Sequence, residues 1–300
     1  MKHLVRKEND MTKKERSAQV VEENEMIFRC PICHQSVRVA ERKSLICTNG
    51  HTFDFAKQGY VNVLTKQPNE QYDEQLFEAR QQMIQDSQLY ASLHHEIARI
   101  IQQYIDKSVA PVILLDAGSG EGSHLQKIIA ESKERTITGI GLDIAKEGIL
   151  KAAKSYEEPI WLVGDLANIP MADHTCDVIF NMLSPANYDE FNRILAPGGI
   201  VVKIVPRAHY LQELREVLFA NVQKRTYSNA DTRTLFTRHF ALVDCIPFQH
   251  TQTLTESEMR NLIRMSPLGW NANQQQINAF LQRDCPTITI DVEILIGVKQ

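Results

Sequence analysis

The sequence predicts an α/β protein in which a doubly wound sheet of seven strands follows a small N-terminal metal-binding module. Two observations predict this organisation. From residue 112 onward, short apolar segments alternate with helical patterns, which is typical of βα units that form a mostly parallel sheet. Before them, three cysteines and a histidine lie between positions 30 and 51, in a segment too short to build a sufficient apolar core without a staple.

The segment from Val112 to Gly122 is the centre of the larger domain. It reads V-I-L-L, a buried strand pattern, then D-A-G-S-G-E-G, and a helical pattern begins at Ser123. Glycines allow positive φ and bring backbone N–H groups close to a ligand at the helix N-terminus. The spacing D-x-G-x-G-x-G resembles motif I of the class I S-adenosylmethionine (SAM) methyltransferases and differs from the G-x-G-x-x-G of dinucleotide sites. The predicted SAM-binding residues of this segment are Asp116, Gly118, Gly120, Glu121, Gly122 and Ser123.

The other elements of the domain are read from the same alternation. Further strands are predicted at 137–142, 160–163, 176–180, 241–246 and 287–298, and one more follows the glycines at 198–199 and ends at 206. Helices are predicted at 123–134, 147–155, 190–195, from 207 to about 221, and near 256–265. An amphipathic helical pattern with a break near 86–88 precedes the first strand, and a helix at that place often closes over the cofactor. Tyr90 is our candidate for a cofactor-facing residue there, with helix packing as its alternative role.

Acidic residues at the ends of successive strands extend the predicted cofactor site. Asp143 ends the second strand, 21 residues after Gly122, where a carboxylate can accept hydrogen bonds from both ribose hydroxyls. Asp165 follows the third strand and can accept from the adenine amino group, with Leu166 against the ring. Each acid alone could equally cap a helix or form a loop salt bridge. Their order, together with L-A-P-G-G at 195–199, favours a SAM site.

The N-terminal module has the spacing C-x2-C-x13-C-x3-H. Two short knuckles of this kind bring three thiolates and an imidazole into a tetrahedron, which suits zinc. Because four protein ligands leave no open position, we expect the zinc to be structural. The alternative is three core cysteines and an unrelated surface histidine. The predicted metal ligands are Cys30, Cys33, Cys47 and His51.

The module is also locally basic, with five Lys or Arg residues against Glu41 and Asp54. Basic residues with interleaved aromatics could bind RNA phosphates and stack on bases. For Phe53 and Phe55, packing in the core of the module is the better interpretation.

Composition is that of an ordinary globular protein, with 43% hydrophobic and 23% charged residues. No apolar run approaches the ~20 residues of a membrane span, and no secretory signal is recognised at the N-terminus. We therefore expect a cytoplasmic protein with reduced cysteines. The net charge of −4 means that any nucleic-acid surface must be local.

Four segments are predicted from these patterns. Residues 1–25 are expected to be a mobile tail, with an amphipathic helix as the alternative, and Met26 could be the true start. Residues 26–64 form the zinc-binding RNA-recognition module, residues 65–105 a linker with connecting helices, and residues 106–300 the methyltransferase domain.

From Met26 onward, the chain resembles the bacterial 23S rRNA (guanine-N(1))-methyltransferases of the RlmA/TlrB type. The matching text is C-P-I-C-H-Q, I-C-x-x-x-H-x-F-D-x-A-K-x-G-Y-V-N-V-L, L-D-A-G-S-G-E-G, G-L-D-I-A-K, G-D-L-A-N-I-P, S-P-A-N-Y and K-I-V-P. The S-P-A-N-Y form is closer to the Gram-positive branch. Motif I has Gly-Ser-Gly where the family usually has Gly-Cys-Gly. Tyr210, beside His209, stands where the family places a cofactor-binding histidine, and it is kept as a candidate cofactor residue.

The resemblance implies transfer of the SAM methyl group to N1 of a guanine in a 23S rRNA hairpin, with a homodimer as one option. N1 lies on the Watson–Crick edge, so the guanine must be unpaired or flipped out. The loop after the fourth strand is expected where this base would meet SAM. For Asn187 and Tyr188, helix capping and packing are alternatives of equal weight, and no proton acceptor is predicted. The candidates for positioning the base are Asn181, Asn187 and Tyr188.

Two other functions are compatible with parts of the sequence. A SAM-dependent small-molecule methyltransferase that has gained a zinc module would have an apolar substrate pocket and no affinity for RNA. A catalytically silent RNA-binding protein would bind RNA without turnover. The intact acidic and glycine positions of motif I argue against a dead SAM site.

Overall fold

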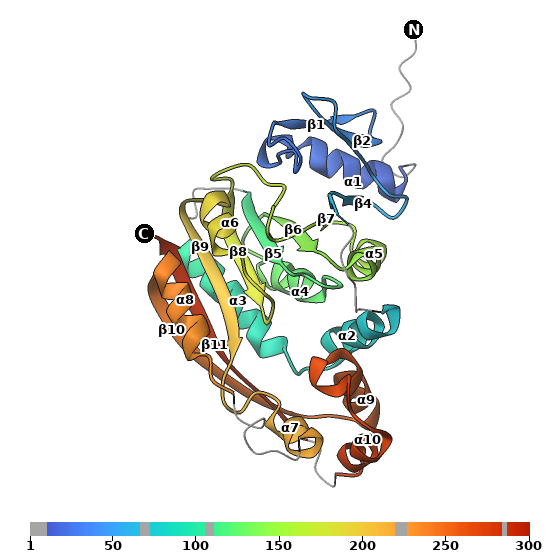
Figure 1. Cartoon of the computed structure of the whole chain (residues 1–300), viewed down its shortest axis with the longest axis vertical. Coiled ribbons are helices and arrows are strands. Elements are labelled where there is room, and N and C mark those ends of the chain that lie inside the picture. The colour runs from blue at the N-terminus through green and yellow to red at the C-terminus, as the bar shows by residue number, and fades with distance from the viewer. Residues whose placement is uncertain (1–10, 67–72, 106–110, 220–226, 284–286) are drawn as a thin grey trace.

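The computed structural model describes residues 11–66, 73–105, 111–219, 227–283 and 287–300. A sheet of eight strands forms its centre, in the order β10-β11-β9-β8-β5-β6-β7-β4 (Figure 1). Neighbouring strands are parallel from β9 to β4, and β11 is antiparallel to both β9 and β10. The strands are β4 (Tyr60–Asn62), β5 (Val112–Ala117), β6 (Ile137–Asp143), β7 (Ile160–Val163), β8 (Cys176–Met182), β9 (Leu195–Pro206), β10 (Phe240–Thr253) and β11 (Thr287–Lys299).

Seven of these strands are the predicted ones, and β4 is an addition that the sequence does not predict. It comes from the N-terminal module and pairs in parallel with β7, with Val61 opposite Leu162. The central strands β5 and β7 are buried along their whole length because helices or the module cover both faces of the sheet.

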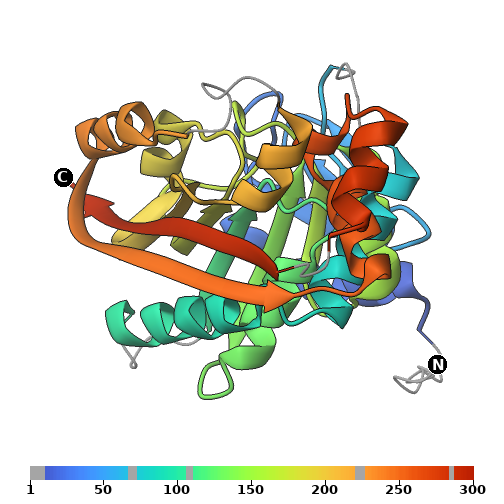
Figure 2. The same ribbon diagram turned by 90° about the horizontal axis from the view of Figure 1, so that it is seen from below.

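Helices lie on both faces of the sheet, as a doubly wound fold requires. Figure 2 shows α3 on one side of the sheet and α8 on the other. Alternate residues of β5 join different cores: Leu114 packs in the cluster of α3 and α4, whereas Leu115 packs in the cluster of α6, α8 and the module. The helices of this domain are α2 (Glu74–Asp86), α3 (Ala91–Tyr104), α4 (Ser123–Glu131), α5 (Lys146–Ser155), α6 (Tyr188–Ile194), α7 (Gln212–Leu218), α8 (Ala230–His239), α9 (Glu256–Met265) and α10 (Gln274–Leu281).

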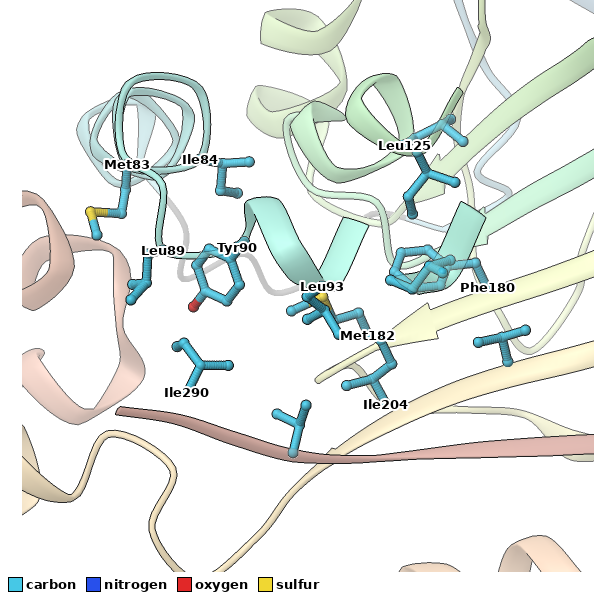
Figure 3. Packing of buried hydrophobic residues seen from close by; sticks show 14 of the residues in the cluster. Met83, Ile84, Leu89, Tyr90, Leu93, Leu125, Phe180, Met182, Ile204 and Ile290 are labelled. Carbon is cyan, nitrogen blue, oxygen red and sulfur yellow. The ribbon is translucent and has the colours of Figure 1, made fainter. Parts of the chain in front are cut away.

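The connection between α2 and α3 is a well-packed part of the first core. Figure 3 shows Tyr90 between Leu89 and Leu93, with Leu93 next to Met182 and Ile204 of the same cluster. The predicted break in the helical pattern falls in this connection, where Ser87 ends α2 in an extended conformation. The break therefore places Tyr90 at the carboxyl end of the sheet.

The N-terminal module consists of helix α1 (Lys13–Glu22) and a small antiparallel sheet of β1 (Val37–Ala40), β2 (Ser44–Cys47) and β3 (Thr52–Asp54). Residues 13–22 form a helix, which is the alternative that was expected for the N-terminal tail. Thr12 and Glu15 form a capping box at the start of α1, and the helix buries Ala18 and Val21 against the module. The first ten residues lie outside the described part of the chain.

The aromatic residues of the module belong to its core, as expected. Phe55 is buried, and Phe53 packs against the same cluster. Among the described residues, no helix is long and apolar enough to span a bilayer.

Candidate active site and metal centre

A cavity of about 690 Å³ opens at the carboxyl ends of the parallel strands. Ligands of open α/β sheets bind at this edge, and the volume lies within the usual range for small-molecule and cofactor sites. Its wall also includes Phe77 and Arg80 of α2. The predicted cofactor residues that line the cavity are Tyr90, Gly118, Gly120, Asp143, Asp165, Leu166 and Tyr210.

The glycine-rich turn after β5 needs its glycines for two reasons. Gly118, Gly120 and Gly122 all have positive φ, at 88°, 58° and 79°. A Cβ on Gly122 would lie 2.2 Å from Cη2 of Trp161, and a Cβ on Gly118 would lie 2.1 Å from Oγ of Ser184. The turn is therefore pressed against β7 on one side and against the loop after β8 on the other.

Asp143 organises this turn through both of its carboxylate oxygens. Oδ2 accepts a hydrogen bond from the Gly120 N–H and Oδ1 accepts one from the Ala145 N–H, each at 2.8 Å. Each oxygen keeps a further lone pair for a ligand in the cavity. Burial raises the pKa of this carboxyl. The cavity, the glycine turn and the carboxylate at the end of β6 thus fit the nucleoside part of SAM.

The remaining predicted residues of motif I do not line the cavity. Asp116, Glu121 and Ser123 are buried beneath the turn, and Gly122 packs on Trp161. Burial raises the pKa of Asp116 to about 8. The hydroxyl of Ser123 lies 2.9 Å from that of Tyr156. These residues support the turn, and their predicted direct contact with the cofactor remains a prediction.

The four predicted metal ligands come together in the N-terminal module. The ligand atoms of Cys30, Cys33, Cys47 and His51 all lie within 4.8 Å of one another. The sulfurs of Cys33 and Cys47 are 3.6 Å apart, close to the ~3.7 Å expected for two thiolates on one tetrahedral zinc. The N–H groups of Ile32 and His51 approach the sulfurs of Cys30 and Cys47, which shapes the two knuckles. Three thiolates and one imidazole form a closed donor set that fits a structural zinc ion.

Comparisons with known proteins agree with both sites. Residues 28–69 match the family model described as "RlmA, N-terminal", and residues 115–203 match the methyltransferase domain model. The chain is 40% identical to a Bacillus subtilis protein named "Putative 23S rRNA (guanine-N(1)-)-methyltransferase YxjB", over 91% of this chain and 97% of the relative. The chain belongs to the RlmA-type 23S rRNA (guanine-N(1))-methyltransferase family.

Two further relatives carry related names. A Streptomyces fradiae protein named "23S rRNA (guanine(748)-N(1))-methyltransferase" is 29% identical over 83% of this chain and 88% of its own length. A Micromonospora griseorubida protein named "Putative 23S rRNA (guanine-N(1)-)-methyltransferase" is 28% identical over 89% of this chain and 95% of its own length. The protein is a SAM-dependent methyltransferase with an N-terminal zinc ribbon.

In this RlmA-type methyltransferase, the three candidates for positioning the base have other contacts. Asn181 donates to the backbone oxygens of Ala117 and Pro185, at 2.6 and 3.0 Å. Asn187 is the N-cap of α6, where its Oδ1 accepts from the Glu190 N–H. None of the three lines the cavity.

Tyr188 packs in the hydrophobic core. Its ring is buried against Phe236 and Phe240, with ring centroids 5.9 Å apart in each pair. For Asn187 and Tyr188 these contacts are the capping and packing that were expected as their alternative roles, and the positioning of the base by Asn181, Asn187 and Tyr188 stays a prediction. The same loop instead presents Ser184 and Pro185 to the cavity.

Arg80 is the main cavity residue that sequence reasoning misses. Its Nε lies 2.6 Å from Oε2 of the buried Glu121, directly under the glycine turn. An ideal Cβ on Gly120 would lie 3.3 Å from the same nitrogen. One signal is visible in the sequence: Arg80 stands on the apolar stripe of its helix, between Phe77 and Met83. A charged residue on a core-facing stripe indicates a buried partner.

Two tyrosines meet inside the cavity of the methyltransferase. The hydroxyls of Tyr90 and Tyr210 are 3.3 Å apart, and both residues line the cavity. The Tyr90 ring also meets the His124 imidazole edge to face, with centroids 5.2 Å apart. Tyr210 therefore lies in the cofactor cavity although it replaces the histidine of the family pattern.

A buried histidine pair should make stability depend on pH. His94 Nε2 and His124 Nδ1 are 2.8 Å apart, and burial lowers the pKa of His94 to about 4 and that of His124 well below 6.5. Below pH 6.5 the histidines of the unfolded chain bind protons that those of the folded chain do not. The free energy of unfolding therefore decreases as the pH is lowered. Between pH 7 and pH 5, we expect the wild type to lose about 3 kcal/mol more than a His94→Gln/His124→Gln variant.

Chemical denaturation of both proteins at the two pH values measures this difference. The raised pKa of Asp116 acts with the opposite sign, because its protonated form is favoured in the folded state and that contribution is lost as the pH rises towards 8. Asp116 is present in both proteins, so the comparison isolates the histidines. Equal pH dependence in the two proteins would show that the pair is protonated in the folded state.

Proposed function

We propose that this protein transfers the methyl group of SAM to N1 of a guanine in 23S rRNA. One observation carries the proposal: the RlmA-type zinc ribbon adds strand β4 to the same sheet whose carboxyl edge forms the cofactor cavity. The names of the three relatives support N1 of guanine as the methylated atom and 23S rRNA as the substrate. A ribosomal substrate also agrees with the cytoplasmic location that the sequence predicts.

The side chains at the rim of the cavity are consistent with an RNA base as the acceptor of the methyl group. Trp270 and Tyr227 line the cavity and are 40% and 41% exposed, and the exposed apolar side chains of Ile144 and Leu183 line the same cavity. Aromatic and apolar side chains at the mouth of a pocket are well suited to hold an unpaired base by stacking. Four basic side chains of the module are exposed for contact with RNA phosphates: Arg38, Arg42, Lys43 and Lys57.

SAM supplies an electrophilic methyl group on a sulfonium, so the chain mainly has to position the two reactants. Asp143 and the glycine turn would hold the nucleoside end of the cofactor. Pro185 and the rim residues would hold the plane of the guanine with N1 towards the methyl group. The N1 proton must leave during or before transfer, so a proton acceptor is needed near the base.

Incubation with labelled SAM and 23S rRNA transcribed without modifications tests the proposal. We expect label on the RNA and one new reverse-transcription stop at a guanine, because a methyl group on N1 blocks base pairing. An rRNA in which that guanine is replaced by adenine is the matched control and should take up no label. Label on the RNA without a reverse-transcription stop would show that the methyl group is transferred to an atom other than N1. SAM binding without any label on RNA would favour the small-molecule alternative.

A further inference from the structure

Lys203 is a buried charged residue that the proposed function has not used. It lies in the apolar strand β9, is 4% exposed and lines the cavity. Its neighbours along the strand, Val202 and Ile204, are fully buried and apolar. Lysine is seldom buried without an ionic partner, because removing an ammonium group from water is costly.

The surroundings of the Lys203 amine favour its neutral form. Nζ donates to Oδ1 of Asn181 and, at 3.1 Å, to the backbone oxygen of Ser184. Its neighbours across the sheet are Asn181 and Leu295, neither of which is titratable. No carboxylate in the described ranges forms an ion pair with it. Burial is the cause that lowers the pKa of Lys203 to about 8.

The two acceptors match a neutral amine. A neutral amine has two N–H groups and one lone pair, whereas an ammonium group has three N–H groups and no lone pair. With its two N–H groups directed to Asn181 and Ser184, a neutral Lys203 keeps its lone pair free. The other titratable side chains along the cavity on the β9–α7 side are Tyr210 and Arg215. Neither of them forms a hydrogen bond or ion pair with Lys203 in the described structure.

Lys203 also lies close to the cofactor turn. Ser184, whose backbone oxygen it contacts, is the residue pressed against Gly118 of the cofactor turn. Pro206, Tyr227 and Trp270 line the same cavity. Lys203 therefore shares one cavity with the cofactor turn and with the aromatic rings that are suited to hold a base.

We propose that the neutral amine of Lys203 accepts the N1 proton of the target guanine during methyl transfer. This inference rests on the proposed function. Nζ takes the proton, and the electron pair of the former N1–H bond forms the bond to the methyl carbon. The electrons of the broken carbon–sulfur bond remain on sulfur, which gives S-adenosylhomocysteine. Asn181 is then a positioning residue, which holds the amine with its lone pair towards the base.

Single-turnover methylation of 23S rRNA at saturating SAM, followed from pH 6 to pH 10, tests the role of Lys203. We expect the wild-type rate to rise with pH and to level off near pH 8. Lys203→Met keeps the apolar stem, and Lys203→Arg keeps the donors to both oxygens but stays protonated. Both variants should be at least about 100-fold slower, which is typical of a lost general base, and neither should level off near pH 8.

A purely structural lysine predicts different results. If Lys203 only ties down the loop after β8, Lys203→Arg should retain the rate and pH profile of the wild type, and that result would overturn the proposal. So would a plateau near pH 8 in Lys203→Met. Lys299→Met, at the opposite end of the sheet, is the matched control and should leave the rate unchanged. SAM affinity and thermal unfolding of each variant confirm that the fold is kept.

Chemical rescue gives a second, independent readout. In Lys203→Ala, added ethylamine should restore the rate in proportion to its unprotonated concentration, because a small amine can take the place of the missing side chain. The proposed function is judged separately by the wild type alone. A wild type that methylates no rRNA contradicts that function, whereas an active wild type with unaffected Lys203 variants contradicts only the role of the lysine.

Discussion

Removing zinc from the Cys30–Cys33–Cys47–His51 site is expected to unfold the N-terminal module and to abolish rRNA methylation. The module has only a small sheet and a few buried side chains, so its folding depends on the metal. Structural zinc contributes about 10–16 kcal/mol of apparent binding free energy in zinc-finger peptides, far more than this core could replace. We expect Cys47→Ser to lower methylation at least about 100-fold and to increase amide exchange across β1, β2 and β3.

The metal content, rRNA affinity and SAM affinity of Cys47→Ser should be measured together. Affinity for rRNA should fall much more than affinity for SAM, because the glycine turn and Asp143 lie outside the module. Cys245→Ser is the control, since this cysteine lies in β10 outside the cluster. Methylation at the wild-type rate by a Cys47→Ser protein that lacks zinc would show that the metal is dispensable.

The Asp143→Asn substitution is expected to weaken SAM binding by about 100-fold. The carboxylate accepts hydrogen bonds from the N–H groups of Gly120 and Ala145 and has lone pairs left for the ribose. An amide of the same shape would point its own N–H donors at one of these groups. Loss of a hydrogen bond to a charged group costs about 1.5–3 kcal/mol, so a displaced turn and a lost ribose contact account for this effect.

Calorimetric titration with SAM and with S-adenosylhomocysteine measures the effect of Asp143→Asn directly. Asp189→Asn is the matched control, because this aspartate is exposed on α6 and does not line the cavity. Thermal unfolding without ligand separates a loss of binding from a loss of fold. An unchanged Kd for both ligands would show that the ribose is held elsewhere.

Elements with strong local signals could be predicted from the sequence. The apolar run of β5, the glycines that follow it and the cysteine spacing each act within a few residues, so no knowledge of the fold is needed to recognise them. Helix α9 extends over the predicted residues 256–265, because Thr255 and Glu258 form a capping box before an amphipathic pattern.

Weak local patterns explain the elements that were missed. Helix α8 buries only Phe236 in an otherwise mostly polar sequence. Helix α10 is short, and its large apolar residues Ile277, Phe280 and Leu281 follow a run of glutamines, so neither helix has a long apolar stripe to recognise. Strand β4 has three residues and pairs with β7 about 100 positions away. Such a pairing depends on the tertiary fold and leaves no periodic trace.

The candidate site divides in the same way. Spacing along the chain predicts the glycines, Asp143 and the zinc ligands, because each set is local. Arg80 and Lys203 become part of the cavity only because segments that are distant in the sequence pack against them, so local patterns cannot predict their roles. For Asn187, the structure shows local capping of α6, as short polar side chains often bind nearby backbone, and a role in positioning the base stays a prediction.

The pairing of β4 with β7 joins the zinc ribbon to the central sheet, so that the distance and angle between the ribbon and the cavity are fixed. A module on a flexible tether could reach guanines at many distances. The basic module, which we propose as a contact for RNA, is instead built into the edge of the sheet and would hold one fixed span between the RNA and the cavity. Substrate choice then becomes a matter of length and angle in the RNA. One base pair inserted between the contacted hairpin and the target guanine would carry that guanine past the cavity, although every base that the protein touches is unchanged.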